Sequence, residues 1–424
     1  MAKKSLEERD RDIIWHPYTQ MKNAGFPIPI VRGEGVYLIA ENGKKYIDAV
    51  ASWWVNIHGH AHPYIAEKVS EQLRTLEHVI FAGFTHPSAV ELAERLLEIL
   101  PSEQKKVFYS DNGSTAVEVA LKMCFQYWSN QGLKKTKVLA FHNSYHGDTF
   151  GAMAVSARSA FTKPFDDFLF DVKFIDLPDK DNIEELKSYI SSISNELSAF
   201  IFEPLVQGAG GMLMYEAAYL DQLILHCKNE GILTIADEVM TGFGRTGQFF
   251  ASDHLSEKAD LMCFSKGITG GTMALGLTTC TNAIYEAFLS DDKYKTLFHG
   301  HSFTANPIAC AAALASLDIL LREETIANIQ RIVLAHQGFA AQIKNHPKIR
   351  DVRQTGTILA IEWDSASGTS YFNRLRDNLY SFFLEEGILL RPLGNIIYIL
   401  PPYCISNQEL DFVYSRIRMA LERF

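Results

Sequence analysis

The chain has 424 residues, with 40 basic and 50 acidic side chains and a formal charge of −10. At roughly 150 residues per domain, this length predicts two to three domains. Hydrophobic residues make up 47% and charged residues 21%, which is typical of a globular enzyme and excludes a disordered chain. The acidic balance argues against a nucleic-acid binder, and no stretch reaches the roughly 18 consecutive apolar residues of a membrane span. Because the start is charged and unlike a secretory signal, we expect a cytoplasmic protein.

The pattern of expected helices and strands changes twice along the chain. Residues 1 to about 30 predict a helix followed by an irregular arm, and GVYLIAENGKKYIDAVAS predicts a β-hairpin around Asn42-Gly43. Short apolar runs then alternate with helical segments such as STAVEVALKMCFQYW, which predicts an α/β fold with a mostly parallel sheet. The expected strands are KVFYS, KVLAF, FIFEP, ILTIADEV and LMCFSK.

After about residue 325 the pattern is a charged helix, the strand TILAIEW, another helix and IIYILPP, which predicts a smaller α+β domain. We therefore expect an N-terminal arm and hairpin over 1–60 that packs with the small domain. A large domain would span 61–325 and the small domain 326–424. Six scattered cysteines without a C-x-x-C spacing indicate reduced core residues.

Two polar residues at predicted strand ends are candidates for chemistry. Lys266 follows an apolar strand, where desolvation would lower the pKa of its ammonium and free a Schiff-base nucleophile; the alternative is an ordinary surface lysine. Asp237 ends another strand, where a buried carboxylate requires a cation, such as a protonated pyridine nitrogen. The structural alternative is an ion pair with Arg245, and we expect Glu238 and Arg245 to form such a pair.

Two other sequence patterns, a glycine-rich motif and a histidine triplet, resemble cofactor or metal sites. Gly242 to Gly247 match G-x-G-x-x-G, but no amphipathic helix follows, so we reject dinucleotide binding. The triplet His58, His60 and His62 lacks a nearby carboxylate or cysteine doublet, so we expect no metal.

A loop entering a helix, SDNGSTAVEVALKM, carries Gly113 and Ser114 at the first turn of that helix. Free N–H groups at a helix N-terminus bind phosphate, so this turn is a candidate phosphate site. The structural alternative, which is compatible with the first, is that Ser114 caps the helix.

These motifs together resemble one family. DEVMTGFGRTG, followed by FSKG with its lysine 29 positions after the aspartate, is similar to the class III, or ω-type, aminotransferases of pyridoxal 5′-phosphate fold type I. NGSTAVEVALK and HGHSFTANPIACAAALA look like that family's phosphate loop and its segment that reaches across a dimer. The resemblance covers nearly the whole chain. It implies a seven-stranded sheet sandwiched by helices in the large domain, and a homodimer with shared active sites.

The resemblance also assigns roles to individual residues. It implies that Lys266 forms the Schiff base and moves the proton, that Asp237 holds the pyridinium nitrogen, and that Tyr145 stacks on the ring. The remaining implied roles are phosphate binding by Gly113 and Ser114, completion of the phosphate cup by Ser302 of the partner beside His301, a substrate pocket lined by Tyr18, Trp53 and Gly300, and capture of a substrate carboxylate by Arg391.

Finer features are similar to the biotin-pathway branch of this family: WHPYTQM, ASWWVNIHGHAHP, SYHGDTFGAMAVS, EPLVQGAGGM and RPLGNIIYILPPY. The resemblance implies ping-pong transfer of an amino group onto 8-amino-7-oxononanoate, with S-adenosylmethionine as the usual donor. A long aliphatic substrate suits an aromatic wall of Trp53 or Trp54, only one of which can face the pocket, and its carboxylate suits a guanidinium.

The donor and the reaction type leave alternatives open. Many S-adenosylmethionine-using members carry Pro-Thr where this chain has His301-Ser302, and Met where it has Thr304, so HGHSFTANP looks closer to members that use lysine. Another ω-aminotransferase, of the ornithine or 4-aminobutyrate type, is a rival reading, although such enzymes lack the paired tryptophans. A racemase, mutase or decarboxylase on the same fold is a second. A non-catalytic cofactor-binding protein is a third, and the Asp237–Lys266 pair argues against it.

Overall fold

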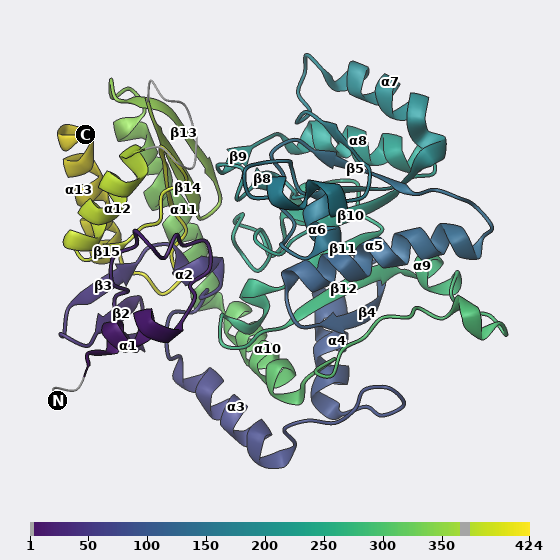
Figure 1. The fold of residues 1–424 in the computed structure, drawn as a ribbon, viewed down its shortest axis with the longest axis horizontal. Coiled ribbons are helices and arrows are strands. Elements are labelled where there is room, and N and C mark those ends of the chain that lie inside the picture. The colour runs from purple at the N-terminus through teal and green to yellow at the C-terminus, as the bar shows by residue number, and fades with distance from the viewer. Residues whose placement is uncertain (1–3, 365–373) are drawn as a thin grey trace.

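The computed structural model describes residues 4–364 and 374–424. Its largest sheet has seven strands, of which six run in one direction and β12 runs in the opposite direction. This arrangement confirms the expected α/β fold with a mostly parallel sheet (Figure 1). In spatial order the strands are β4 (Gln104–Ser110), β12 (Gly276–Thr281), β11 (Leu261–Phe264), β10 (Leu233–Asp237), β7 (Leu197–Phe202), β5 (Lys137–Phe141) and β6 (Val172–Ile175).

Both faces of this sheet are buried, because alternate residues of its strands belong to two different apolar clusters. In β5, Val138 and Ala140 pack with α5 (Gly113–Asn130), whereas Leu139 and Phe141 pack with the side that carries α7 (Ile183–Ile193) and α8 (Ala217–Asn229). Burial on both faces explains why these strands are continuous apolar runs in the sequence. The other helices of this part are α3 (Pro63–Thr75), α4 (Pro87–Ile99), α6 (Phe150–Val155), α9 (Asn282–Glu286) and α10 (Pro307–Leu320).

The N-terminal and C-terminal segments share a second sheet. The hairpin forms as expected, with Gly43 at φ 82° in its turn, and β3 pairs in parallel with β15 from near the C-terminus. The expected division at 60 and 325 stays a prediction, although this pairing favours an N-terminal arm packed on the C-terminal part. The strands are β1 (Ile30–Glu34), β2 (Tyr37–Ala40), β3 (Lys45–Asp48) and β15 (Ile388–Leu389).

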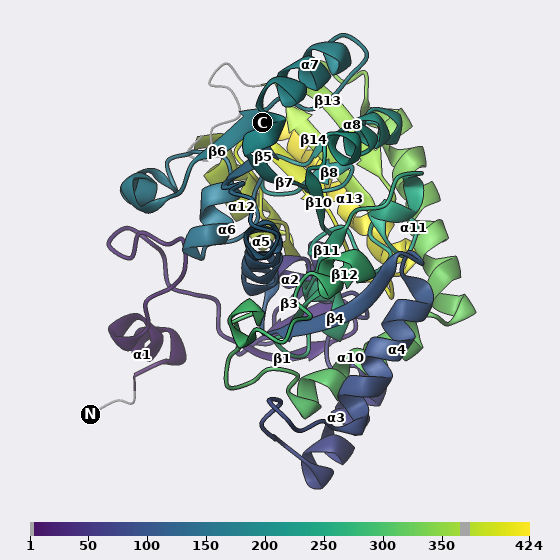
Figure 2. The ribbon, with the colours of Figure 1, turned by 90° about the vertical axis from the view of Figure 1, so that its right-hand side faces the viewer.

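The C-terminal part has the expected α+β composition. A three-stranded antiparallel sheet is covered by helices that lie on one side of the molecule (Figure 1). Its elements are α11 (Glu323–Ile343), β13 (Ile349–Thr355), β14 (Ile358–Trp363), α12 (Arg374–Glu385), β16 (Ile396–Ile399) and α13 (Asn407–Arg423). The first helix, α1 (Leu6–Ile13), has no buried residue and lies at the margin of the molecule in both views (Figure 2).

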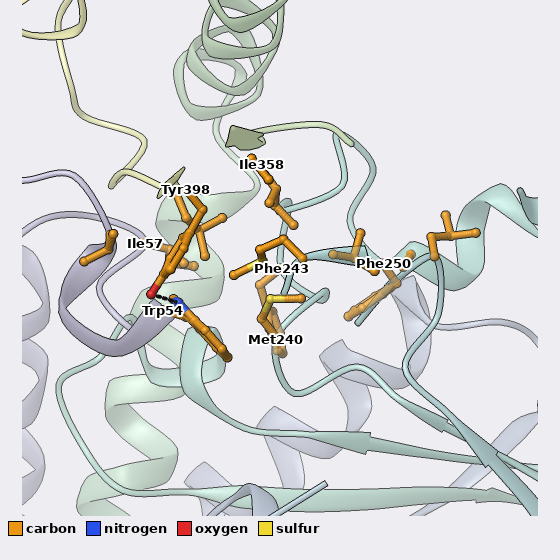
Figure 3. Close-up of a cluster of buried hydrophobic side chains, with 14 of the residues drawn as sticks. Trp54, Ile57, Met240, Phe243, Phe250, Ile358 and Tyr398 are labelled. Carbon is orange, nitrogen blue, oxygen red and sulfur yellow. Dashed lines mark hydrogen bonds between the residues drawn. The ribbon is translucent and has the colours of Figure 1, made fainter. Parts of the chain in front are cut away.

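A hydrophobic cluster joins these parts beneath the candidate site. Trp54 packs there with Met240 and Phe243 from the turn after β10, and its indole Nε1 donates to the hydroxyl of Tyr398 on β16 at 3.0 Å (Figure 3). The cluster therefore fixes one wall of the site to three distant segments of the chain. Among the described residues, no helix is long and apolar enough to cross a membrane.

Candidate active site

A cavity of about 700 Å³ opens at the carboxyl ends of the parallel strands. Ligand crevices of open α/β sheets form at this edge, because the polar residues that follow successive strands converge there. Five of the sequence-predicted site residues line it: Gly113, Ser114, Tyr145, Asp237 and Lys266. The structure thus brings together residues that are spread over more than 150 positions of the sequence.

Asp237 is the last residue of β10 and is buried. His146 Nδ1 donates to Asp237 Oδ2 at 2.7 Å, and the backbone N–H of Val239 donates to Asp237 Oδ1 at 3.1 Å. These two hydrogen bonds hold the Asp237 carboxylate in one orientation at the edge of the cavity.

Lys266 follows β11 after one residue and begins a short 3₁₀ turn, with φ at 47°. Burial lowers the pKa of its ammonium to about 8, although the charges of Asp237 and Glu203 act in the opposite direction. The ammonium also lies 4.6 Å from the centre of the Trp54 ring. The neutral, nucleophilic form of this amine is therefore much more populated near neutral pH than that of an ordinary lysine.

The first turn of α5 also lines the cavity. The N-cap of α5 is Asn112, which forms a capping box with Thr115, so the alternative that Ser114 caps the helix is wrong. The hydroxyl of Ser114 instead pairs with Thr149 Oγ1 at 2.7 Å and accepts from the backbone N–H of Thr149 at 3.1 Å. The capping residue lies two positions earlier, because the side chain of Asn112 reaches the backbone N–H of Thr115.

Two aromatic residues and an arginine, none of which lines the cavity, form a separate group beside it. Trp53 is 43% exposed, its ring lies 4.3 Å from the guanidinium carbon of Arg391, and the ring of Tyr18 lies 5.8 Å away. Trp54, in contrast, is 6% exposed and lines the cavity. The two tryptophans therefore face different surroundings. Among the residues that the structure describes, no carboxylate lies within ion-pairing distance of Arg391.

Tyr18 joins this group to the cavity. Its hydroxyl donates to Asp148, a cavity-lining residue, and burial together with this hydrogen bond raises the pKa of Tyr18 to about 12. The hydroxyl therefore stays protonated over the physiological pH range.

Gly300, His301 and Ser302 are not brought to this cavity by their own chain. They lie on a segment before α10 in which Phe298 and Phe303 are 65% and 61% exposed. The segment is nevertheless held in place, because Lys122 Nζ donates to the carbonyl oxygen of Phe298 at 2.7 Å.

Sequence reasoning assigned no role to Glu203, His146 or Asp148, which also line the cavity. Glu203 directly follows β7, and its carboxylate accepts from the backbone N–H groups of Tyr145 (3.0 Å) and Gly208 (2.9 Å). Burial raises the pKa of Glu203 to about 7. The sequence did contain a signal for Glu203, because this carboxylate directly follows the apolar residues of FIFEP just as Asp237 follows those of ILTIAD.

The predicted ion pair between Glu238 and Arg245 is wrong. Glu238 accepts from Thr241 Oγ1 and from the backbone N–H groups of Ala251 and Ser252. Arg245 is buried and donates to the carbonyl oxygens of Pro401 and Trp54. Each charge is therefore compensated by separate dipoles, which sequence spacing does not reveal.

The two rejected cofactor patterns have structural roles. Gly242 to Gly247 form turns, and a four-residue 3₁₀ helix over Ala251–His254 is the next helical element. Of the three histidines, His58 bonds to Ser316 and His60 to Asp48. The described part of the chain holds no group of three or more histidine, cysteine or acidic residues that could bind a metal ion.

Comparison with known proteins agrees with this geometry. The family model "Aminotransferase class-III" matches residues 18–421. An adenosylmethionine-8-amino-7-oxononanoate aminotransferase from Synechococcus elongatus is 46% identical, over 96% of this chain and 98% of the relative. A crystal structure named as the same aminotransferase, from Methanocaldococcus jannaschii, has a TM-score of 0.95 at 37% identity and covers 99% of this chain and 98% of its own.

A second solved structure, the omega transaminase from Pseudomonas jessenii in complex with PMP, has a TM-score of 0.93 at 28% identity. The alignment covers 99% of this chain and 98% of that one. The match to the family model, the cavity and the lysine–aspartate pair agree over nearly the full length. This protein belongs to the class-III aminotransferase family.

Proposed function

We propose that this protein transfers an amino group from S-adenosylmethionine to 8-amino-7-oxononanoate, giving 7,8-diaminononanoate for biotin synthesis, with pyridoxal 5′-phosphate as the carrier. The observation that carries the proposal is Arg391, stacked on Trp53 beyond the lysine–aspartate cavity. A guanidinium without a described carboxylate partner suits the distal carboxylate of a long keto acid. The names of the similar aminotransferases support the same substrate.

The residues of the cavity fit pyridoxal 5′-phosphate. The Asp237 carboxylate can accept from a protonated pyridine nitrogen, the N–H groups at the start of α5 suit a phosphate, and Lys266 supplies an amine. The omega transaminase that holds PMP, the amine form of this cofactor, supports the assignment. When bound, the cofactor would carry the amino group and stabilise the electrons left after proton removal.

Each residue would contribute a separate part of the transfer. Lys266 would hold the cofactor at its aldehyde and, when displaced by substrate, move a proton at Nζ. His146 would hold the Asp237 carboxylate in orientation through its hydrogen bond. Tyr145 would cover the ring, fixed by the hydrogen bond from its backbone N–H to Glu203. Tyr18 and Trp53 would line the path of the aliphatic substrate.

We also propose a homodimer in which Ser302, beside His301 and Gly300, completes the phosphate site of the partner. Exposure of Phe298 and Phe303 on the same well-anchored segment supports this, because large aromatic side chains favour burial. Sedimentation should give about twice the 47.7 kDa chain mass. A monomer with full activity would contradict the shared site.

The identity of the donor can be tested directly in the first half-reaction. S-adenosylmethionine added alone should abolish the visible band of the enzyme-bound cofactor, and lysine added alone should leave it unchanged. The reverse result would make this a lysine-dependent enzyme and give His301-Ser302 a role in donor choice. If neither amine changes the band, both donor assignments are wrong.

The pKa of Lys266 predicts how cofactor uptake depends on pH. The rate at which cofactor-free enzyme takes up pyridoxal 5′-phosphate should rise with pH and level off above about 8, because the neutral amine then predominates. An ordinary lysine reaches that point only near pH 10.5. Stopped-flow absorbance measures the rate, with N-α-acetyl-lysine as the ordinary amine for comparison. A rate that continues to rise past pH 10 would show that burial does not tune Lys266.

Close packing against Ser114 predicts the effect of Gly147→Ala. A Cβ at Gly147 would lie 2.3 Å from Ser114 Oγ, and the φ of 137° is itself unfavourable for alanine. We expect cofactor affinity to fall by about tenfold, which corresponds to about 1.4 kcal/mol. Gly132→Ala is the matched control, since it also has a positive φ but nothing within 4 Å. Equal loss of cofactor affinity in both variants would exclude a specific role of the Gly147–Ser114 contact.

A further inference from the structure

The backbone between β3 and the cavity has an unusual conformation. Ala51, Ser52 and Trp54 have φ values of 48°, 59° and 68°. This left-handed region is disfavoured for residues that carry a side chain, so the conformation persists only where surrounding contacts hold it. Ala51 and Ser52 lie directly before the two tryptophans, and the third residue with a positive φ is Trp54 itself.

One carboxylate makes several of the contacts that hold this segment. Asp48, the last residue of β3, is fully buried. Its Oδ1 accepts from the backbone N–H groups of Ser52 (2.8 Å) and Val50 (3.3 Å), and its Oδ2 accepts from Ser52 Oγ (2.9 Å). His60 Nε2 donates to the same Oδ2 at 2.8 Å. Ser52 is therefore tied to Asp48 through both its backbone and its side chain.

The consequence is that adjacent tryptophans point to different places. Trp54 is turned inward, where its ring meets Lys266 Nζ, and Trp53 is turned outward against Arg391. In a regular strand, neighbouring side chains point to opposite faces of the sheet. Here the turn directs Trp54 to the lysine end and Trp53 to the arginine end of the proposed site, so the conformation of Ser52 determines the direction of both rings.

We propose that Asp48, held by His60, is a positioning residue for amino transfer. By fixing Ser52 it places Trp54 against the lysine end of the site and Trp53 against the arginine end. The inference rests on the proposed function, because it takes Trp53 and Arg391 as the binding surface of the keto acid. Asp48 itself touches neither Lys266 nor the cavity and acts only through the segment that it holds.

A purely structural role for Asp48 is the competing explanation. The nearby guanidinium of the buried Arg245 is stabilised in part by the charge of Asp48. Removing that charge would lower the melting temperature whatever the tryptophans do. The test must therefore measure KM for the keto acid separately from stability.

The experiment is a double-mutant cycle on the holoenzyme. Asp48→Ala and Trp53→Ala should each raise KM for 8-amino-7-oxononanoate by at least about tenfold, or about 1.4 kcal/mol. The double variant should show no further increase in this KM, because the effect of Asp48 at the arginine end, where the keto acid binds, is exerted through Trp53, whereas Trp54 lies at the lysine end. Asp260→Ala is the matched control. Asp260 also accepts from a backbone N–H and a hydroxyl, both of Thr234. Thr234 lies near the start of β10, at the other end of the strand from Asp237. Asp260→Ala should lower the melting temperature and leave KM unchanged.

Ser52→Gly keeps the test decisive if Asp48→Ala does not fold. Glycine tolerates the positive φ, so stability should be retained, while the loss of the hydroxyl frees the segment and raises KM. An unchanged KM in Ser52→Gly, or additive effects in the cycle, would overturn the positioning role while the proposed function stands. Failure of the wild-type enzyme to aminate 8-amino-7-oxononanoate would instead overturn the proposed function.

Discussion

Lys266→Ala should abolish turnover, lowering kcat by at least roughly 10³-fold. The variant loses both the nucleophile that holds the cofactor and the group that moves the proton, and proton transfer alone contributes about 10²–10⁴-fold to catalysis. Because the cavity and the Asp237–His146 pair stay intact, the variant should still bind pyridoxal 5′-phosphate without a covalent bond.

The covalent bond can be measured apart from activity. Borohydride treatment followed by mass spectrometry should add one cofactor to each wild-type chain and none to Lys266→Ala. Lys173→Ala is the control, since Lys173 is far from the cavity lining and pairs with Asp171. It should be labelled and active like the wild type. Retained turnover, or cofactor attached to Lys266→Ala, would place the nucleophile at another residue.

Arg391→Ala should weaken binding of the keto acid by about 2–5 kcal/mol and spare the donor half-reaction. Truncating one member of a hydrogen-bonded charge pair leaves the other charge without its partner, which is the source of this loss. The donor has no distal carboxylate on a long aliphatic chain, so the first half-reaction does not depend on this contact. Single-turnover measurements of each half-reaction separate the two effects.

Arg391→Lys tests whether the shape of the guanidinium matters. Lysine keeps the charge but cannot form two parallel hydrogen bonds to a carboxylate or stack as a planar group on Trp53. Its keto-acid affinity should lie between those of the wild type and Arg391→Ala. Equal damage to both half-reactions in Arg391→Ala would show that Arg391 supports the fold or binds the donor.

Elements with a strong apolar pattern could be predicted from the sequence. KVLAF matches β5 at both ends, and ILTIADEV contains β10, because strands buried on both faces consist almost entirely of apolar residues. β12 was not predicted. Its sequence, GLTTCT, includes three threonines, and two of them, Thr278 and Thr279, are buried with hydrogen-bonded hydroxyls. Tertiary partners, which the local pattern does not show, allow this strand to form.

Site residues at the ends of predicted strands could be predicted from the sequence, whereas the directions in which neighbouring side chains point could not. Asp237 and Lys266 follow strands, so the sheet brings them to one edge. The choice between Trp53 and Trp54 remained open because it is made by left-handed residues held by a buried carboxylate. Arg245 was misassigned for a similar reason, since backbone carbonyl oxygens satisfy it.

A single turnover of the second half-reaction shows whether 8-amino-7-oxononanoate is the amino acceptor. Enzyme loaded with pyridoxamine phosphate is mixed with 8-amino-7-oxononanoate in the absence of any donor, and products are quantified by mass spectrometry. We expect one 7,8-diaminononanoate per active site, together with the return of the visible band of the aldehyde cofactor. Unchanged pyridoxamine phosphate with 8-amino-7-oxononanoate, but rapid conversion with another keto acid or an amino aldehyde, would contradict this expectation.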